Sequence, residues 1–255
     1  MKRFTHLEFD DSSDSSKPSG SGEAVRDEGY FHKRALQCFL HGDFELALRN
    51  YSRALEVNSS YFDGWAGQIW MLIELGEYPE AMIWADKAME LFPEHPELLA
   101  AKGVACLRDA KYDKAKGFSD NSISKDNVGP RVWLGRAEIL LQSKSRVGDN
   151  CLSKATTMTG PEADLIRLEA GRLLRRYGRH STAIDYLQQA VARFPKSALA
   201  WYELGYCQMR LGFSQAETSL EQCLHLHPHF AEAKEVLRVA QGGFLRRFFY
   251  RLGLG

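Results

Sequence analysis

A spacing of 34 residues recurs along this chain of 255 residues, and it constrains the fold more than any other feature. Two columns of residues show it, one mostly small and one mostly bulky. The small column is Gly42, Gly76, Ala110, Lys144, Gly178 and Gly212, and the bulky column is Phe31, Trp65, Leu99, Trp133, Arg167 and Trp201. A third column contains Ala47, Ala81, Ala115 and Ala183. Columns that share one period over six repeats predict an array of like units.

Each unit is predicted to be a pair of antiparallel helices. Between the columns the apolar residues have helical spacing, as at Trp201, Leu204 and Leu211. A helix that ends at Gly42 or Gly76 can leave through a left-handed residue, which glycine adopts at little cost. Prolines at 93, 161 and 195 stop the second helix of their units. Small residues between the helices allow the two axes to approach closely.

These residues resemble the tetratricopeptide repeat family, over about residues 28–229. The resemblance is clearest in Trp201-Tyr202-Glu203-Leu204-Gly205 and in Gly76-Glu77-Tyr78 with Ala81, Ala88 and Pro93. It implies an all-α fold, a right-handed α-solenoid of about six helix hairpins. A helix over 230–241 is expected to cap the array, because the last hairpin would otherwise expose its apolar face.

In the family that this chain resembles, the first helices of the hairpins line a concave groove that binds a partner segment. The resemblance therefore implies a protein-binding scaffold or adaptor, as a subunit or assembly factor of a larger complex. The register places these groove residues: Trp70, Arg108, Arg172, Arg175, Arg176, Tyr202, Tyr206 and Arg210. Arginine pairs with carboxylates in bidentate fashion, which predicts an acidic or carboxylate-bearing peptide. The alternative is a solvated face with local ion pairs.

One branch of the family grips the C-terminal carboxylates of chaperones with a lysine and an asparagine in its first repeat. His32 and Leu36 stand at the matching positions here. Chaperone docking of that kind is therefore not expected.

The two ends of the chain have a different composition from the repeats. Residues 1–24 are acidic and rich in serine, which predicts a disordered tail. Residues 244–255 predict a basic amphipathic helix, with docking residues Phe244, Arg246, Arg247, Phe248, Phe249 and Arg251. That helix could cap the array, dock on a protein or lie on a membrane surface. The last possibility gives the alternative function, a peripheral membrane adaptor.

Other functional classes find little support in the sequence. The chain has 33 basic and 33 acidic residues, so no global field attracts nucleic acid. No apolar run approaches the roughly 20 residues of a membrane span, and a cytoplasmic protein is expected. No phosphate-binding loop, zinc-protease or serine-hydrolase motif occurs, so we expect neither catalysis nor a cofactor.

One segment invites a metal interpretation, because Cys223 is followed by His225, His227 and His229. Pro228 interrupts the helix that could align these histidines, and Cys223 occupies a core column. We therefore expect no metal site within this segment.

Overall fold

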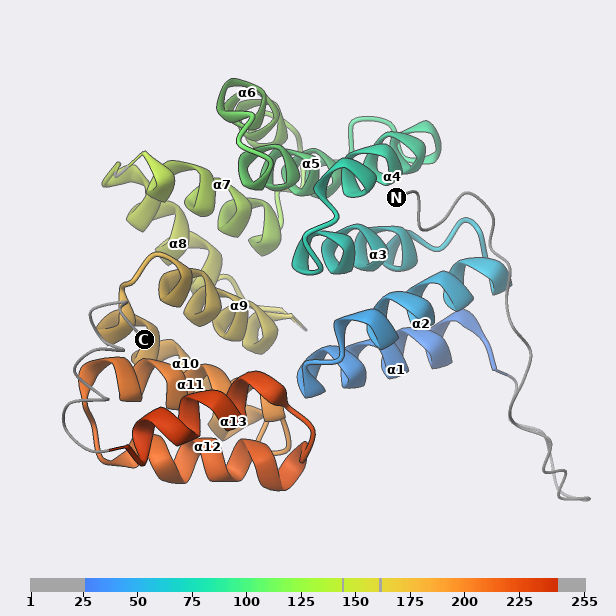
Figure 1. Cartoon of the computed structure of the whole chain (residues 1–255). Helices are drawn as coiled ribbons and strands as arrows, with labels where there is room; N and C mark the ends of the chain where they lie inside the picture. The colour runs from blue at the N-terminus through green and yellow to red at the C-terminus, as the bar shows by residue number, and fades with distance from the viewer. Residues whose placement is uncertain (1–25, 144, 161, 243–255) are drawn as a thin grey trace, which may run out of the picture.

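The computed structural model describes residues 26–143, 145–160 and 162–242 (Figure 1). Within these residues the chain is entirely helical and contains no strand. The helices are α1 (Glu28–His41), α2 (Phe44–Val57), α3 (Phe62–Glu74), α4 (Tyr78–Leu91), α5 (Pro96–Arg108), α6 (Tyr112–Ile123), α7 (Pro130–Gln142), α8 (Val147–Thr157), α9 (Ala163–Arg176), α10 (His180–Arg193), α11 (Ala198–Leu211), α12 (Gln215–Leu226) and α13 (Ala231–Ala240). The first twelve pair as six hairpins, which confirms the predicted all-α solenoid. The predicted tails at 1–24 and 244–255 lie outside the described residues.

The tight turns inside the hairpins depend on backbone that glycine adopts easily. Gly42 and Gly76 have φ angles of 91° and 82°, in the left-handed region. At the end of α1, Gly42 donates to the carbonyl of Phe39 and Asp43 donates to the carbonyl of Cys38, both at 2.9 Å. These bonds satisfy carbonyls that the helix leaves without partners. The chain can therefore reverse within two residues.

Close packing of the hairpins explains the columns of small residues. Ala47, Ala81, Ala115 and Ala183 are fully buried. A Cβ atom on Gly171 would lie 2.6 Å from Cγ of Leu187, in the opposite helix of the same hairpin. Larger residues at these positions would push the helix pairs apart.

The array bends until its first and last hairpins meet, as the ring of helices in Figure 1 shows. Helix α1 contacts α11, and Ser197 Oγ donates a hydrogen bond of 2.7 Å to the carbonyl of Leu40. Phe230, just before α13, covers the turn at Gly42, where a Cβ atom would lie 2.9 Å from its ring. We call this contact between α1 and the region from α11 to Phe230 the seam.

The described helices are all too short or too polar to span a bilayer.

Candidate partner-binding site

The inner side of the ring is formed by the first helix of each hairpin, as the sequence predicts. A cavity at its centre is lined by residues from α1, α3, α5, α7 and α9. Its volume is about 40 Å³, which accommodates a few water molecules but no peptide. The centre of the predicted groove is thus filled by the protein's own side chains.

Glu74, at the end of α3, is the first of three buried carboxylates that fill this centre. It accepts from Arg172 at 2.6 Å and from Arg108 at 3.2 Å. Burial by itself would raise the pKa of Glu74, but the charges of Arg172 and Arg108 lower it well below the usual range. Glu74 is therefore ionised and joins α3 to both α5 and α9.

The other two carboxylates extend this arrangement along the ring. Glu138 accepts from Arg108 Nε at 2.9 Å and from its Nη2 at 3.2 Å, and Arg176 also reaches it at 3.2 Å. Glu203 accepts from Arg172 Nε at 3.2 Å and forms an ion pair with Arg175. We call these three glutamates and four arginines the central network. Five of its seven side chains are at most 12% exposed, so these charges are stabilised mainly by one another rather than by water.

The central network changes the environment of the predicted groove residues. Arg172 is only 7% exposed, and its guanidinium lies 5.4 Å from the Phe39 ring and 5.2 Å from the Phe44 ring. Arg108 is bound on both sides by carboxylates. Arg176 is the most exposed of the four arginines and lies at the edge of the network. The alternative of local ion pairs describes what these side chains do, and their binding of a partner stays a prediction.

The remaining predicted residues lie on either side of this centre. Trp70 is half-buried and donates from Nε1 to Glu97 at 3.2 Å. Tyr202 is buried, and its ring centroid lies 4.9 Å from that of Phe230 in the seam. Tyr206 is half-buried beneath the guanidinium of Arg175, at 4.8 Å, and Arg210 is half-buried one turn further along α11. The tail residues Phe244, Arg246, Arg247, Phe248, Phe249 and Arg251 lie outside the described residues.

A larger pocket opens at the N-terminal ends of the inner helices, and we call it the mouth pocket. Its volume is about 370 Å³. Apolar walls come from α1, α3 and α9, and they include Leu36, Phe39, Trp70, Met71 and Leu165. Its charged residues are Asp63, Glu97, Arg131, Glu162 and Glu169.

Carboxylates outnumber cationic groups in the mouth pocket. The Arg131 guanidinium contacts Glu169 at 3.1 Å, Glu162 at 3.4 Å and Glu97 at 3.6 Å. Burial raises the pKa of Glu97 to about 7, against the opposing charge of Arg131. Burial also raises the pKa of Glu169. These carboxyl groups retain protons more readily than ordinary ones because they are buried and the charge of Arg131 offsets that burial only in part.

Two acidic residues of the mouth pocket lie at the N-terminal ends of helices, where negative charge is favourable. Asp63 and Glu97 are each the second residue of their helix, where the helix dipole favours negative charge. Arg131 occupies the same position in α7, and its three acidic neighbours offset the unfavourable dipole. The sequence interpretation overlooked this site, although Asp63, Glu97 and Arg131 follow one another at the 34-residue spacing.

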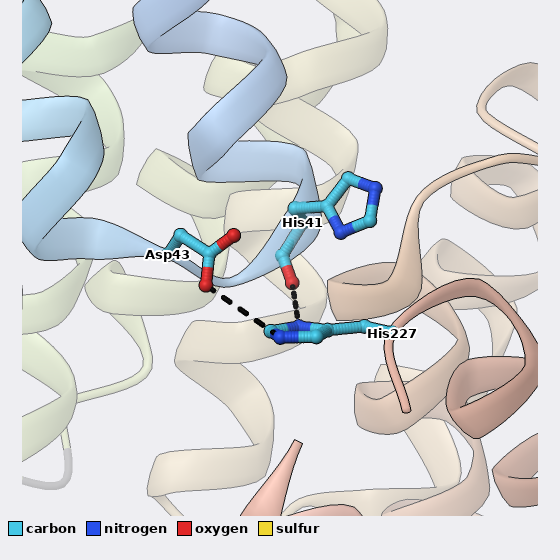
Figure 2. Close-up of side chains that lie close together, drawn as sticks. All are labelled: His41, Asp43 and His227. Carbon is cyan, nitrogen blue, oxygen red and sulfur yellow. Dashed lines mark hydrogen bonds and ion pairs between the residues drawn. The ribbon is translucent and has the colours of Figure 1, made fainter. Parts of the chain in front are cut away.

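Among the described residues, one group has the composition of a metal site: His41, Asp43 and His227 (Figure 2). It shares only His227 with the segment from Cys223 to His229 that the sequence draws attention to. Cys223 is fully buried in the core, and burial raises its pKa to about 12. His225 and His229 are exposed and take no part in the group.

Parts of the sequence are similar to those of known proteins. A tetratricopeptide repeat model matches residues 41–96 and 168–213. The protein SGT1 homolog of Oryza sativa subsp. japonica is 37% identical over 83 residues, which are 32% of this chain and 23% of that protein. The Hsp70-Hsp90 organizing protein of Triticum aestivum is 25% identical over 200 residues, which cover 74% of this chain and 33% of that protein. The chain therefore spans a quarter to a third of the length of these relatives.

The fold also matches a solved structure, that of the APC/C hetero-tetramer Cut9–Hcn1. The TM-score is 0.54 at 15% identity, over 85% of this chain and 43% of that chain. Six stacked helix hairpins with a shared inner face define a helical repeat protein of the α-solenoid class. Its repeats at residues 41–96 and 168–213 belong to the tetratricopeptide repeat family.

Proposed function

We propose that this chain is a protein-interaction scaffold, and that the mouth pocket holds a lysine or arginine side chain of a partner segment. The observation that carries the proposal is the excess of carboxylates there. Glu97, Glu162 and Glu169 all contact the guanidinium of Arg131. A second cation would restore the balance of charge and allow the carboxyl groups to ionise fully.

The walls of the pocket suit the stem of such a side chain. Lysine and arginine carry three or four methylene groups that pack against apolar surface while the charged end reaches polar groups. Leu36, Phe39 and Leu165 offer that surface, and the Trp70 indole adds an aromatic face. The volume lies at the low end of the range for small-ligand pockets, so one or two side chains fit rather than a whole helix.

The relatives support the scaffold part of the proposal. The wheat relative is named as an organizing protein for Hsp70 and Hsp90, and the Cut9–Hcn1 structure is a hetero-tetramer. By analogy, we propose that this chain acts as a subunit or assembly factor that holds another protein. The chaperones themselves are not carried over, because His32 and Leu36 replace the residues that grip their carboxylates.

The basic partner differs from the acidic partner that the arginine positions predict. Arg108 and Arg172 already face Glu74, Glu138 and Glu203, so their charges are compensated within the chain. A carboxylate ligand would have to displace these buried partners. The mouth pocket instead offers uncompensated charge of the opposite sign.

Peptide libraries with one fixed central residue separate the two partner chemistries. We expect pools fixed as arginine or lysine to bind about tenfold more tightly than pools fixed as glutamate or leucine, measured by fluorescence anisotropy. The double variant Glu97→Gln with Glu169→Gln should remove this preference. Glu90→Gln, an exposed glutamate on the outer helix α4, is the matched control. Equal binding of all pools, or an unchanged preference in the double variant, contradicts the proposal.

The same experiment tests the acidic partner. Tighter binding of the glutamate pools, lost in Arg176→Glu, would favour the original prediction of a carboxylate-bearing peptide. Arg176 is chosen because it is the exposed arginine of the central network.

A further inference from the structure

We propose that His41, Asp43 and His227 bind a divalent transition metal ion, in particular Zn²⁺, and that the ion fastens the two ends of the ring together. His41 ends α1 and Asp43 precedes α2, whereas His227 follows α12. The three ligand atoms lie within 4.8 Å of one another. The site is independent of the mouth pocket and of the function proposed for it.

The hydrogen bond of His227 prepares its ring for metal binding. Its Nδ1 lies 3.1 Å from the carbonyl oxygen of His41, as Figure 2 shows. A carbonyl oxygen only accepts, so Nδ1 carries the proton and Nε2 presents its lone pair. Metal-binding histidines in proteins commonly donate their other ring nitrogen in this manner, which fixes the tautomer and the orientation of the ring.

The separation of Asp43 from His227 also fits an ion between them. Asp43 Oδ1 lies 3.7 Å from His227 Nε2, which is longer than a hydrogen bond. Two ligands at roughly 2.0–2.1 Å from a tetrahedral zinc ion lie about 3.4 Å apart. A small approach of the two groups therefore creates the geometry that the ion requires.

His41 can supply the third ligand through rotation of its side chain. Its ring centroid lies 5.5 Å from that of His227, and the left-handed turn at Gly42 keeps His41 and Asp43 at the same end of the first hairpin. Two imidazoles and one carboxylate form a ligand set that zinc accepts, with a water molecule as the fourth ligand. All three residues are half-buried, so the ion has access from solvent.

Binding would stabilise the closed ring. The ligands come from residues 186 positions apart, and an ion that binds them together favours the state in which the seam is formed. Phe230 lies against the His227 ring at 5.4 Å and over Gly42, which places the site within the packing of the seam. Metal availability would thereby control how firmly the first hairpin is held to the last.

The test uses the full chain without an affinity tag, after treatment with EDTA. Titration with ZnCl₂ in a calorimeter should show one equivalent of binding, and Co²⁺ should give the visible absorption of a tetrahedral site. Zn²⁺ should raise the midpoint of thermal unfolding. We expect His227→Gln and Asp43→Asn each to weaken Zn²⁺ binding at least tenfold and to abolish the thermal shift.

His225→Gln and His229→Gln are matched controls, because both histidines lie in the same segment but outside the group. Circular dichroism without metal shows whether each variant is folded, and His41→Gln provides a further ligand variant. The proposal is overturned if the wild-type chain gives neither binding heat nor Co²⁺ absorption. It is also overturned if His227→Gln binds Zn²⁺ as tightly as His229→Gln.

Discussion

Ser197 donates a hydrogen bond from its hydroxyl to the carbonyl oxygen of Leu40, although the two residues are 157 positions apart in sequence. The distance is 2.7 Å, and Ser197 is 1% exposed. The same hydroxyl accepts from the backbone N–H of Ala200 at 3.1 Å, as the N-cap of α11. One hydroxyl group thus accepts from a backbone N–H in the first turn of α11 and donates to a backbone carbonyl in the last turn of α1.

The two roles of Ser197 can be separated by substitution. Ser197→Ala should lower the free energy of unfolding by about 2 kcal/mol, because it removes a helix cap and leaves a buried carbonyl without its donor. Ser197→Asp keeps a capping acceptor but has no proton to donate to Leu40 at neutral pH, so it should also be destabilised. Ser197→Thr retains both functions. Urea unfolding measures all three, and a Ser197→Asp variant as stable as the wild type would show that the bond to Leu40 contributes nothing.

Arg172 is predicted to be the most sensitive residue of the central network. Its removal, as Arg172→Met, leaves Glu74 and Glu203 buried with fewer partners and should cost about 3 kcal/mol in the free energy of unfolding. Arg193→Met breaks an exposed pair with Asp164 and should cost less than about 1 kcal/mol. Urea is the suitable denaturant because it leaves ion pairs unscreened.

A second substitution shows whether this cost arises from charge. Glu74→Gln in the Arg172→Met background removes one of the stranded carboxylates and should recover part of the lost stability. Strictly additive effects of the two substitutions would contradict direct coupling between the residues.

The sequence predicts the repeats and their inner face, but not the closure of the ring. The 34-residue columns arise from contacts within a hairpin and between adjacent hairpins. Such contacts involve residues close in sequence, so the sequence pattern predicts them. The register also places Glu138 beside Arg108 and Arg172 on inner helices. In contrast, the ion pair of Glu74 with Arg172 joins residues 98 positions apart. Small rotations between successive hairpins add up over the array, so no local pattern shows which repeats finally meet.

The same reasoning applies to the candidate sites. Asp63, Glu97 and Arg131 follow the 34-residue spacing, so the sequence could have predicted that these charged residues lie together in the mouth pocket. Of the group of His41, Asp43 and His227, the sequence indicates only His227, since the other two ligands meet it through contact between the two ends of the solenoid.

Glu97 gives a prediction about pH. Its pKa is about 7 in the folded chain because of burial, above the ordinary value of 4.5 that it has when unfolded. The folded chain therefore binds a proton that the unfolded chain has released, and this contribution to stability is lost as pH rises from about 4.5 through about 7. Glu97→Gln should be more stable than the wild type at pH 8 by roughly 1–2 kcal/mol, but not at pH 4.5.

Urea unfolding between pH 4.5 and pH 8 measures this difference, with Glu90→Gln as the control. A constant difference between wild type and Glu97→Gln across the range would show that Glu97 titrates normally. If the mouth pocket binds a basic side chain, the wild type should also bind the arginine peptide pools more tightly at pH 8 than at pH 5.5, with release of protons.

Gly42 tests whether the seam itself stabilises the fold. Gly42→Ala introduces a Cβ atom at positive φ, and that atom would also lie 2.9 Å from the Phe230 ring. Gly76→Ala meets the same backbone strain, with φ of 82°, but has nothing within 4 Å. Strain alone should cost each variant about 1–2 kcal/mol, and the contact with Phe230 should add about 1 kcal/mol or more for Gly42→Ala.

If contact across the seam causes the larger loss of stability in Gly42→Ala, that difference from Gly76→Ala must depend on Phe230. In a Phe230→Ala background the ring is absent, so Gly42→Ala and Gly76→Ala should cost the same within error. Urea unfolding of the wild type, the three single variants and the two double variants gives this comparison directly. Equal costs already in the wild-type background would contradict the prediction, and would mean that the packing of Phe230 over Gly42 contributes nothing to stability.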